Sequence, residues 1–495
     1  MEPVIIFGTG GLLKSLYNYI TDIYYIKFFL DNNEGKHGTK IENKLIVKPD
    51  STLLTTNERI IIASYFFDEI KEQLVNLGVG RDRIFNVADD VVLFDGICSK
   101  VKESDNAVRV KNEISAAPID SNKLNMLFVV NSMVMGGSEL SLLNLLKKIN
   151  NEKTNIILLV INGGGALTKR VPNEVTIVEI YKSSDECALQ QSIFRYLSPD
   201  VLSTTYVNRR FDAVISYTMG SSAKLACGVS AGKKIAWIHS DLSVSHPTKA
   251  CFGSMDDEIS CYNRFSNIVF VSKASLHGFK KLFKGVCVKK QVFGNIFDFE
   301  EIINKSKLFD LQLDDTFNNM LGKRFLYVGR LSAEKGVVRL INAFDKALKI
   351  YNDIYLVIVG SGELSEKILH IISERKMESN VKLVGECDNP YPYMLFSDVL
   401  ILPSYYEGQP LVIGEAFILG LPVIATGSDA CREMLNDGEY GLVVENSESG
   451  ILNGIFQTIS QEDFISIYTK KSQLGFASLR TKVEYDFFST DMPKI

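Results

Sequence analysis

Two glutamates stand eight positions apart in the segment SYYEGQPLVIGEAF, residues 404–417. The apolar run DVLILPS ahead of it predicts a buried strand, which puts Glu407 in the loop at the strand's carboxyl end. Pro410 suits the first position of a helix and Gly420 ends it, so Glu415 is predicted on that helix. Open α/β sheets bind ligands at the carboxyl ends of their strands. The two carboxylates are therefore expected to face one cleft.

The chemistry available to this pair is the recognition of hydroxyl groups beside a phosphate. A carboxylate accepts two hydrogen bonds in its plane, which suits the vicinal hydroxyls of a ribose or a hexose. Unpaired amides at the start of the predicted helix, around residues 411–413, would attract a diphosphate. Together they indicate a sugar-nucleotide pocket. Taken alone, each glutamate is better explained as a solvated loop or helix residue.

Two cations in the segment YVGRLSAEKG support the same interpretation. Arg330 follows a predicted strand, and Lys335 lies at the start of a helix, where a cation opposes the helix dipole unless an anion offsets it. Such local conflicts are typical of functional sites. A diphosphate leaving group needs positive charge of this kind where no metal supplies it, and the sequence has no D-x-D triplet that would indicate a metal site. Two solvated surface cations are the competing explanation.

Strand and helix signals alternate in three rounds along the 495 residues. The first round, residues 1–98, predicts a small α/β domain, and the polar stretch 99–123 predicts a linker. The pattern restarts over 124–300 and again over 301–465. Strands that alternate with helices imply parallel sheets, so the fold class is α/β. Two successive α/β units of similar size occur in nucleotide-using enzymes, which hold the ligand between them.

The composition narrows the function. Hydrophobic residues make up 46% and charged residues 23%, as in globular proteins, and the net charge of −5 gives no general attraction to nucleic acid or anionic lipid. The eight cysteines form no C-x-x-C pair and do not cluster with the five histidines, which predicts reduced thiols and no metal site. Neither a signal peptide nor a run of about 18 apolar residues is seen, which predicts a cytoplasmic protein at most peripheral to a membrane.

The order of the motifs resembles that of the retaining family-4 glycosyltransferases, which have the GT-B fold. The resemblance covers about residues 124–446 and implies two facing Rossmann-like domains, 124–300 for the acceptor and 301–465 for the donor, with helices in 466–495 packing back on the N-terminal half. The matching segments are NSMVMGGSELSLLNLL, WIHSDL, YNRFSNIVFVS, GNIFDFEEI, YVGRLSAEKG, VGSGEL, REML and the E-x7-E block with NPYPY.

The resemblance also implies roles for individual residues. Glu415 would hold the ribose hydroxyls, and Glu407 would lie near the C3 and C4 hydroxyls of the transferred sugar. Arg330 and Lys335 would bind the diphosphate. His239 in WIHSDL would lie beside the reacting sugar, although a lone histidine at the end of a strand is more often structural. The glycines expected in the donor site are Gly136, Gly137 and Gly408.

Two segments near the expected site have no assigned role. GSDACREML departs from the loop usual in the family, so Arg432 and Glu433 are given no sugar contact. Asp241 is as well explained by capping of a following turn.

The mechanism implied by the resemblance is retention by front-face departure and attack at an oxocarbenium-like centre. The leaving diphosphate takes the acceptor's proton, and no metal or other cofactor is required. The expected reaction moves a hexose or N-acetylhexosamine from a UDP-sugar to a glycan or lipid-linked glycan in bacterial surface polysaccharide synthesis. The segment FKKLFKGVCVKK, 279–290, carries five lysines that form either a solvated face or a contact with the cytoplasmic face of the inner membrane.

The first domain resembles Rossmann-like modules fused to sugar-modifying enzymes. Gly8 and Gly10 match the first two glycines of G-x-G-x-x-G, Leu13 replaces the third, and Asp31 lies where a ribose-binding acid would fall. This domain would bind a nucleotide or sugar nucleotide, or serve as a scaffold. Two other functions stay open for the chain: a nicotinamide-dependent sugar-modifying enzyme acting through residues 1–98, and a non-catalytic sugar-nucleotide-binding assembly protein.

Overall fold

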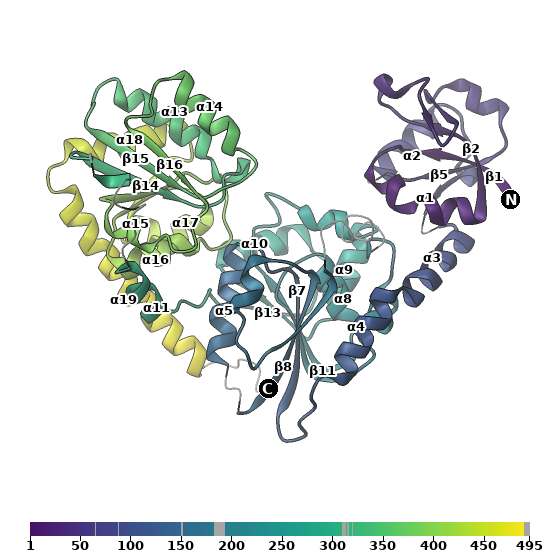
Figure 1. Cartoon of the computed structure of the whole chain (residues 1–495), viewed down its shortest axis with the longest axis horizontal. Helices are drawn as coiled ribbons and strands as arrows, with labels where there is room; N and C mark the ends of the chain where they lie inside the picture. Colours follow the sequence, from purple (N-terminus) through teal and green to yellow (C-terminus); the bar gives the residue numbers. More distant parts are fainter. Residues whose placement is uncertain are drawn as a thin grey trace.

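The chain folds around three sheets, one in each lobe of the molecule (Figure 1). We call the lobes the N-terminal, central and C-terminal domains, in chain order. The structure is a computed structural model, and it describes residues 1–64, 66–87, 89–149, 152–182, 194–308, 313, 316–318 and 320–489.

The N-terminal domain has a six-stranded sheet in the order β3-β4-β2-β1-β5-β6, parallel except for the β3–β4 hairpin. Its strands are apolar runs such as VIIF, whose side chains are buried on both faces. The hairpin turn places Glu42 and Asn43 at φ values of 46° and 66° without a glycine, so Asn43 alone of this pair is a residue type that favours the turn. The elements are β1 Glu2–Phe7, α1 Gly11–Ile23, β2 Tyr24–Leu30, β3 Lys40–Ile41, β4 Lys44–Val47, β5 Arg59–Ile62, α2 Phe67–Asn76 and β6 Ile84–Asn86.

The predicted linker, 99–123, is largely helical. Helices α3 (Val91–Glu103) and α4 (Asp105–Ala116) run between the N-terminal and central domains (Figure 1). Ser104 caps α4 by accepting a hydrogen bond from the Ala107 backbone N–H at 3.3 Å. The two helices join the buried clusters of both domains, so the connection is a packed one.

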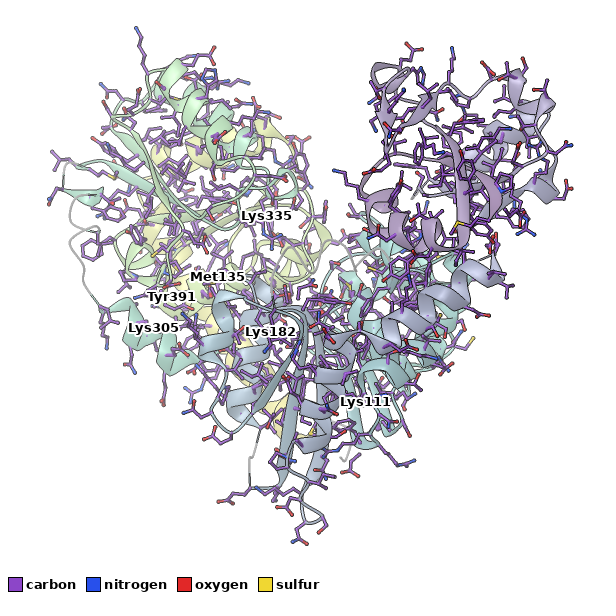
Figure 2. The ribbon with its side chains drawn as sticks, turned by 45° about the vertical axis from the view of Figure 1, so that its right-hand side comes forward. Lys111, Met135, Lys182, Lys305, Lys335 and Tyr391 are labelled. Carbon is purple, nitrogen blue, oxygen red and sulfur yellow. The ribbon has the colours of Figure 1, made fainter. Side chains whose placement is uncertain are left out.

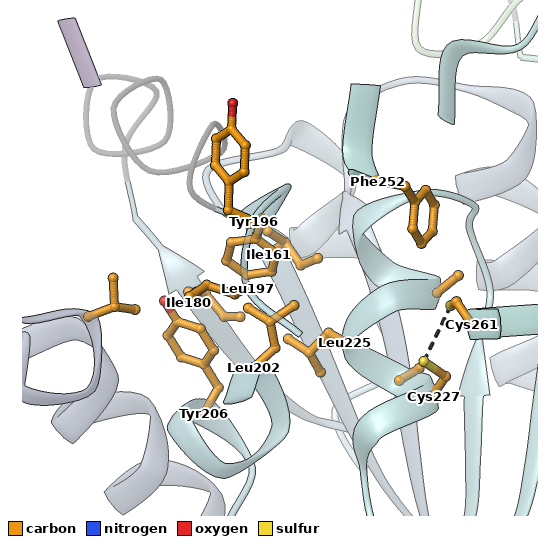
Figure 3. Packing of buried hydrophobic residues seen from close by; sticks show 14 of the residues in the cluster. Ile161, Ile180, Tyr196, Leu197, Leu202, Tyr206, Leu225, Cys227, Phe252 and Cys261 are labelled. Carbon is orange, nitrogen blue, oxygen red and sulfur yellow. Dashed lines mark hydrogen bonds between the residues drawn. The ribbon is translucent and has the colours of Figure 1, made fainter. Parts of the chain in front are cut away.

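The central domain has a seven-stranded parallel sheet in the order β13-β12-β11-β10-β7-β8-β9. Beside this sheet, Leu197, Leu202 and Tyr206 pack near Ile180 of β9 (Figure 3). The elements are β7 Leu124–Ser132, α5 Gly137–Lys148, β8 Thr154–Asn162, β9 Thr176–Tyr181, α7 Pro199–Tyr206, β10 Phe211–Ser216, α8 Ser221–Gly228, β11 Ala231–Ile238, α9 Met255–Asn263, β12 Asn267–Phe270, α10 Lys273–Leu282, β13 Lys289–Val292 and α11 Phe299–Ser306.

The C-terminal domain has a six-stranded parallel sheet in the order β16-β15-β14-β17-β18-β19. Strands β14 and β17 are adjacent, so the loops that follow them open on the same edge. The elements are β14 Lys323–Val328, α13 Val337–Leu348, β15 Ile354–Val359, α14 Ser365–Glu374, β16 Val381–Gly385, α15 Tyr391–Leu395, β17 Val399–Leu402, α16 Leu411–Leu419, β18 Val423–Thr426, α17 Asp429–Met434, β19 Leu442–Val444 and α18 Glu448–Ser460.

The long last helix, α19 (Phe464–Ser489), packs against the C-terminal domain and against α11. Ser472 Oγ donates a hydrogen bond to the Leu421 carbonyl at 2.8 Å. The Phe476 ring meets the Phe299 ring edge-on, with centroids 5.5 Å apart. This helix therefore connects the helices of the C-terminal domain to the segment where the central domain ends.

The cysteines within the described residues are free thiols, as their spacing predicts. Cys227 and Cys261 lie with their sulfur atoms 3.3 Å apart in the buried core (Figure 3). None of the helices in the described part of the chain combines the length and hydropathy that a membrane crossing needs.

Candidate active site

Glu407 lies in the loop after β17, as predicted, and contacts Lys335. Lys335 Nζ donates to both carboxylate oxygens of Glu407 at 2.8 Å, and Ser404 Oγ donates to one of them at 2.7 Å. The Glu407 side chain is only 8% exposed, whereas that of Lys335 is 27% exposed. Hydrogen bonds between charged groups are shorter and stronger than those between neutral groups. The two predicted donor-site residues are thus joined, with the cation on the more open side.

Arg330 follows β14 at the same edge of the sheet. The buried Tyr327 hydroxyl donates to the Arg330 carbonyl at 2.7 Å and so fixes the start of this loop. Burial and the nearby carboxylates of Glu407 and Glu334 raise the pKa of Tyr327. The same tyrosine therefore lies close to both the Arg330 loop and the Glu407 group.

The glycine turn before α5 brings the central domain against this edge. A Cβ atom built on Gly136 would lie 2.5 Å from Glu139 Oε2 and 3.7 Å from Arg330 Nη2. One built on Gly137 would lie 3.7 Å from Leu411, the first residue of α16. Met135 of this turn is labelled in Figure 2 together with Lys335 and Tyr391 of the facing domain. The turn therefore lies within contact distance of Arg330 and the α16 N-terminus, and the close approach that glycine permits at position 136 is that of the Glu139 carboxylate.

His239 lies at the end of β11, where the two domains touch. A Cβ atom on Gly408 would lie 1.8 Å from the His239 carbonyl oxygen, and Ser272 Oγ donates to the Gly408 carbonyl at 2.6 Å. Burial lowers the pKa of His239 to about 3, so its imidazole is neutral at physiological pH. Within the described residues its buried Nε2 atom has no hydrogen-bond partner. The loop that carries Glu407 therefore rests on the strand end that carries this histidine.

Glu415 lies in the second turn of α16, as predicted, and is 9% exposed. Burial raises the pKa of its carboxyl group to about 7, although the Tyr391 hydroxyl, 3.3 Å away, partly offsets this by donating to Oε1. Glu415 faces a narrow pocket between the domains, and no contact in the described residues joins it to Glu407. The other residues around this pocket include Leu140, Asn144, Arg170 and Leu411.

The structure adds Glu433 to the residues that matter at the domain interface, which sequence reasoning left without a role. Its carboxylate accepts hydrogen bonds from the backbone N–H groups of Lys273 and Ala274, at 3.0 and 3.1 Å. It thereby caps the N-terminus of α10 from across the interface. No signal in the sequence marks this role, because the partners of Glu433 are backbone amides at the start of α10.

Two other predicted positions behave as local structure. Asp241 caps the following turn, since its Oδ1 accepts from the Ser243 N–H at 2.9 Å and from the Ser243 hydroxyl at 2.8 Å. The lysine-rich segment 279–290 covers the end of α10, a turn and the start of β13. Its exposed lysines are Lys280, Lys281, Lys284 and Lys289.

In the N-terminal domain, Asp31 is fully engaged by its neighbours. Its carboxylate accepts from the Thr9 N–H at 3.0 Å, the Thr9 hydroxyl, the Asn33 N–H at 2.9 Å and Lys36 Nζ at 3.2 Å. Burial would raise the pKa of Asp31, but these hydrogen bonds outweigh it and lower the pKa. Gly8 has φ +103° and needs to be glycine, since a Cβ would meet the Ala63 carbonyl at 2.6 Å; a Cβ on Gly10 would meet no atom within 4 Å.

Comparisons with solved structures establish the fold. Anabaena Alr3699/HepE in complex with UDP superposes with a TM-score of 0.55 at 20% sequence identity, covering 74% of this chain and 100% of that one. TarM superposes with a TM-score of 0.58 at 14% identity, covering 74% and 99% of the two chains. The chain has the GT-B fold. The central and C-terminal domains are its two facing halves, and the N-terminal domain is an addition to them.

Family comparisons cover most of the C-terminal domain and the N-terminal domain. Residues 313–467 match the family described as Glycosyl transferases group 1, and residues 1–85 match C2185-like, N-terminal. An N-acetylgalactosaminyltransferase from Campylobacter jejuni, which acts on a diphospho-undecaprenol-linked substrate by its name, is 30% identical over 204 residues, 41% of this chain and 53% of that one. The poly(glycerol-phosphate) alpha-glucosyltransferase of Bacillus subtilis is 31% identical over 158 residues, 30% and 24% of the two chains. The chain spans about half the length of the first relative and a quarter of the second.

Proposed function

We propose that the chain is a retaining, family-4 glycosyltransferase. It moves a hexose or N-acetylhexosamine from a nucleotide-sugar, a UDP-sugar in the first instance, to a glycan or lipid-linked glycan of a bacterial surface polysaccharide. The observation that carries this proposal is the Lys335–Glu407 pair, held at the carboxyl edge of the C-terminal sheet and resting on the His239 strand end of the facing domain. The group 1 match over residues 313–467 and the transferases among the relatives support it.

The cations at this edge suit a departing diphosphate. As the glycosidic bond breaks, negative charge grows on the diphosphate, and groups already aimed at it stabilise the transition state without reorganising. Lys335 is the more exposed partner of its ion pair, so its ammonium can contact an anion while Glu407 stays in place. Arg330 and the first-turn amides of α16 would add to this field. The reaction as proposed needs no metal, and the diphosphate would take the acceptor's proton.

The carboxylates are proposed to bind hydroxyl groups rather than to attack the sugar. Glu407 keeps hydrogen-bond acceptor capacity beyond its contacts with Lys335 and Ser404, so it can orient sugar hydroxyls. Glu415 would hold the ribose hydroxyls next to Tyr391, and the neighbouring pocket, about 20 Å³ in this structure, would widen to admit them. His239 would present a neutral imidazole to the reacting sugar, which is possible because burial holds its pKa near 3. We place the enzyme at the cytoplasmic face of the membrane, with the exposed lysines of 279–290 on the lipid surface.

The proposal is tested with a panel of UDP-, GDP- and ADP-sugars, scored by thermal shift and by release of the free nucleotide. We expect one nucleotide class to stabilise the wild type, and Lys335→Ala and Glu415→Ala to lose most of that stabilisation. Lys346→Ala is the matched control, since Lys346 lies on the same domain and pairs with Glu448 at the surface. Unchanged donor binding in both site variants would overturn the site assignment.

Turnover distinguishes the enzyme from a binding protein. With an identified donor and a glycan acceptor, NMR of the product should show the same anomeric configuration as the donor. An inverted product would refute the retaining mechanism. Tight nucleotide binding without transfer or hydrolysis of any donor would favour the assembly-protein alternative.

A further inference from the structure

A concave basic surface lies on the N-terminal domain, outside the GT-B halves. It is a cavity of about 640 Å³ bounded by β2, the β3–β4 hairpin and the segment after β4. Four lysines line it, Lys27, Lys40, Lys44 and Lys48, against one carboxylate, Asp50. Ligand pockets in proteins commonly measure about 300–1,000 Å³, so the cavity has the size of a small-molecule site.

The four lysines differ in what they already contact. Lys27 pairs with Glu58, and Lys44 Nζ donates to the Tyr25 hydroxyl at 2.6 Å while lying 3.8 Å from the centre of its ring. Within the described residues, the side chains of Lys40 and Lys48 make no hydrogen bond or ion pair. The pKa of the Asp50 carboxyl is lowered mainly by its hydrogen bonds from Thr52 and to a smaller extent by the charge of the nearby Lys48. The cavity therefore carries uncompensated positive charge on exposed side chains.

The floor of the cavity is apolar. Phe28, Leu45 and Val47 line it between the lysines, and Leu45 is 44% exposed. Phe28 and Val47 also pack against the buried cluster that contains Leu53 and residues of α2, whereas Leu45 is exposed on the surface of the cavity.

We propose that this cavity binds a diphosphate joined to an apolar or aromatic group. Lysine ammonium groups act as point charges for phosphate, and the described lining residues include no arginine, whose fork would give planar bidentate binding. Several lysines around one space match a compact anion with more than one charge. The apolar floor would contact the attached group. Two sources share this chemistry, a soluble nucleoside diphosphate and a lipid-linked diphosphate.

The cavity is separate from the glycine-turn position that the sequence indicates in this domain. Gly8, Gly10 and Asp31 are not among the lining residues, and the Asp31 carboxylate is occupied by Thr9, Asn33 and Lys36. It is also separate from the transfer site, whose residues belong to the other two domains. The inference does not rest on the proposed transfer reaction, since it concerns binding alone.

The experiment is isothermal titration of the full-length chain carrying Arg330→Ala and Lys335→Ala, which removes the cations of the transfer site. The probes are UDP, farnesyl diphosphate and inorganic pyrophosphate. We expect one remaining site for UDP or farnesyl diphosphate, with affinity that falls as salt is raised. Adding Lys40→Glu and Lys48→Glu should weaken it by at least about tenfold, because two attractive charges become repulsive. Adding Lys102→Glu and Lys111→Glu, on α3 and α4, is the charge-matched control and should leave it unchanged.

The outcomes separate the two sources and the two sites. Preference for farnesyl diphosphate supports a lipid-linked ligand, and preference for UDP supports a soluble nucleotide. Equal binding of pyrophosphate overturns the role given to Phe28 and Leu45. No binding of any probe, or binding that survives both Lys40→Glu/Lys48→Glu and the milder Lys40→Gln/Lys48→Gln, overturns the site. If the chain with Arg330→Ala and Lys335→Ala binds UDP with the same stoichiometry as the wild type, the assignment of the transfer site fails, while the assignment of the lysine-lined cavity stands.

Discussion

The titration of Glu415 links stability and donor binding in one residue. Burial raises the pKa of its carboxyl group from an ordinary 4.5 to about 7. In the folded chain the group therefore keeps its proton over a pH range in which the unfolded chain has lost it. Its contribution to stability is complete below pH 4.5, declines above that value and is lost as pH rises through 7.

The size of this effect follows from the shift. A pKa difference of one unit corresponds to 1.36 kcal/mol, so the folded state loses about 3 kcal/mol between pH 4.5 and pH 8 on account of Glu415. Glu415→Gln keeps an acceptor for the Tyr391 hydroxyl and stays neutral at every pH. The variant should match the wild type near pH 5 and exceed it at pH 8, by roughly 6–12 °C in the melting temperature of the C-terminal domain.

Donor binding should show the opposite pH dependence. Ribose hydroxyls donate to the ionised carboxylate, and with a pKa of about 7 only about a tenth of the free sites are ionised at pH 6. The wild-type Kd for a nucleotide-sugar should therefore fall about tenfold from pH 6 to pH 8. A sugar diphosphate diester does not itself titrate in this range, and neither does His239, whose pKa lies near 3. Glu415→Gln should bind with a Kd independent of pH.

The measurements are differential scanning fluorimetry and calorimetric titration at pH 5, 6, 7 and 8. A melting difference between variant and wild type that is the same at pH 5 and pH 8 would refute the buried, protonated state. A wild-type Kd that does not change between pH 6 and pH 8, with the stability effect present, would refute the ribose contact and leave the burial argument intact.

Two further predictions concern the domain interface. Gly408→Ala places a Cβ atom 1.8 Å from the His239 carbonyl oxygen, so the loop must move by more than about 1 Å. We therefore expect kcat to fall about 100-fold with little change in melting temperature. A variant that keeps the wild-type kcat would show that the loop does not rest on β11. Glu433→Ala removes two charge-assisted hydrogen bonds to the α10 N-terminus, which stabilise the domain interface by about 1–3 kcal/mol. Small-angle scattering should therefore show a larger radius of gyration for this variant than for the surface control Glu439→Ala. Equal radii would contradict the role of Glu433.

The local frame of the glutamate pair was predictable because each step has its own sequence signal. The strand β17, the loop with Glu407 and the end of α16 at Gly420, which adopts φ +70°, all follow from apolar runs and turn residues. Pro410 differs by one position: its ψ of 109° is extended, so it precedes the helix, which begins at Leu411. The pattern cannot show that Lys335 reaches Glu407, because that contact joins loops 72 positions apart.

The linker prediction shows where polarity averages mislead. Residues 99–123 are mostly polar, but Ala107, Val110 and Ile114 recur at helical spacing and are buried against β9 and α7. An apolar stripe this narrow changes the average hydropathy of the segment very little, yet it is enough to bury one side of α4. The same limit applies to Glu433, whose partners are backbone amides, because only the docked position of α10 shows that its first turn needs an acceptor.

The proposed transfer site is held together by contacts that cross from one GT-B half to the other. Only glycine fits at position 408, because the His239 carbonyl lies where a Cβ atom would be, and Ser272 Oγ donates to the Gly408 carbonyl next to Glu407. On the other side, Arg330 Nη2 lies at contact distance from the glycine turn of the central domain. If the halves separated, the Lys335–Glu407 pair would persist within the C-terminal domain. The neutral imidazole of His239 and the glycine turn at Gly136 would move away from it with the central domain. Under the proposed function, donor binding can therefore begin on the C-terminal domain alone, whereas the geometry for transfer requires closure. This predicts that interface variants affect kcat more than donor affinity.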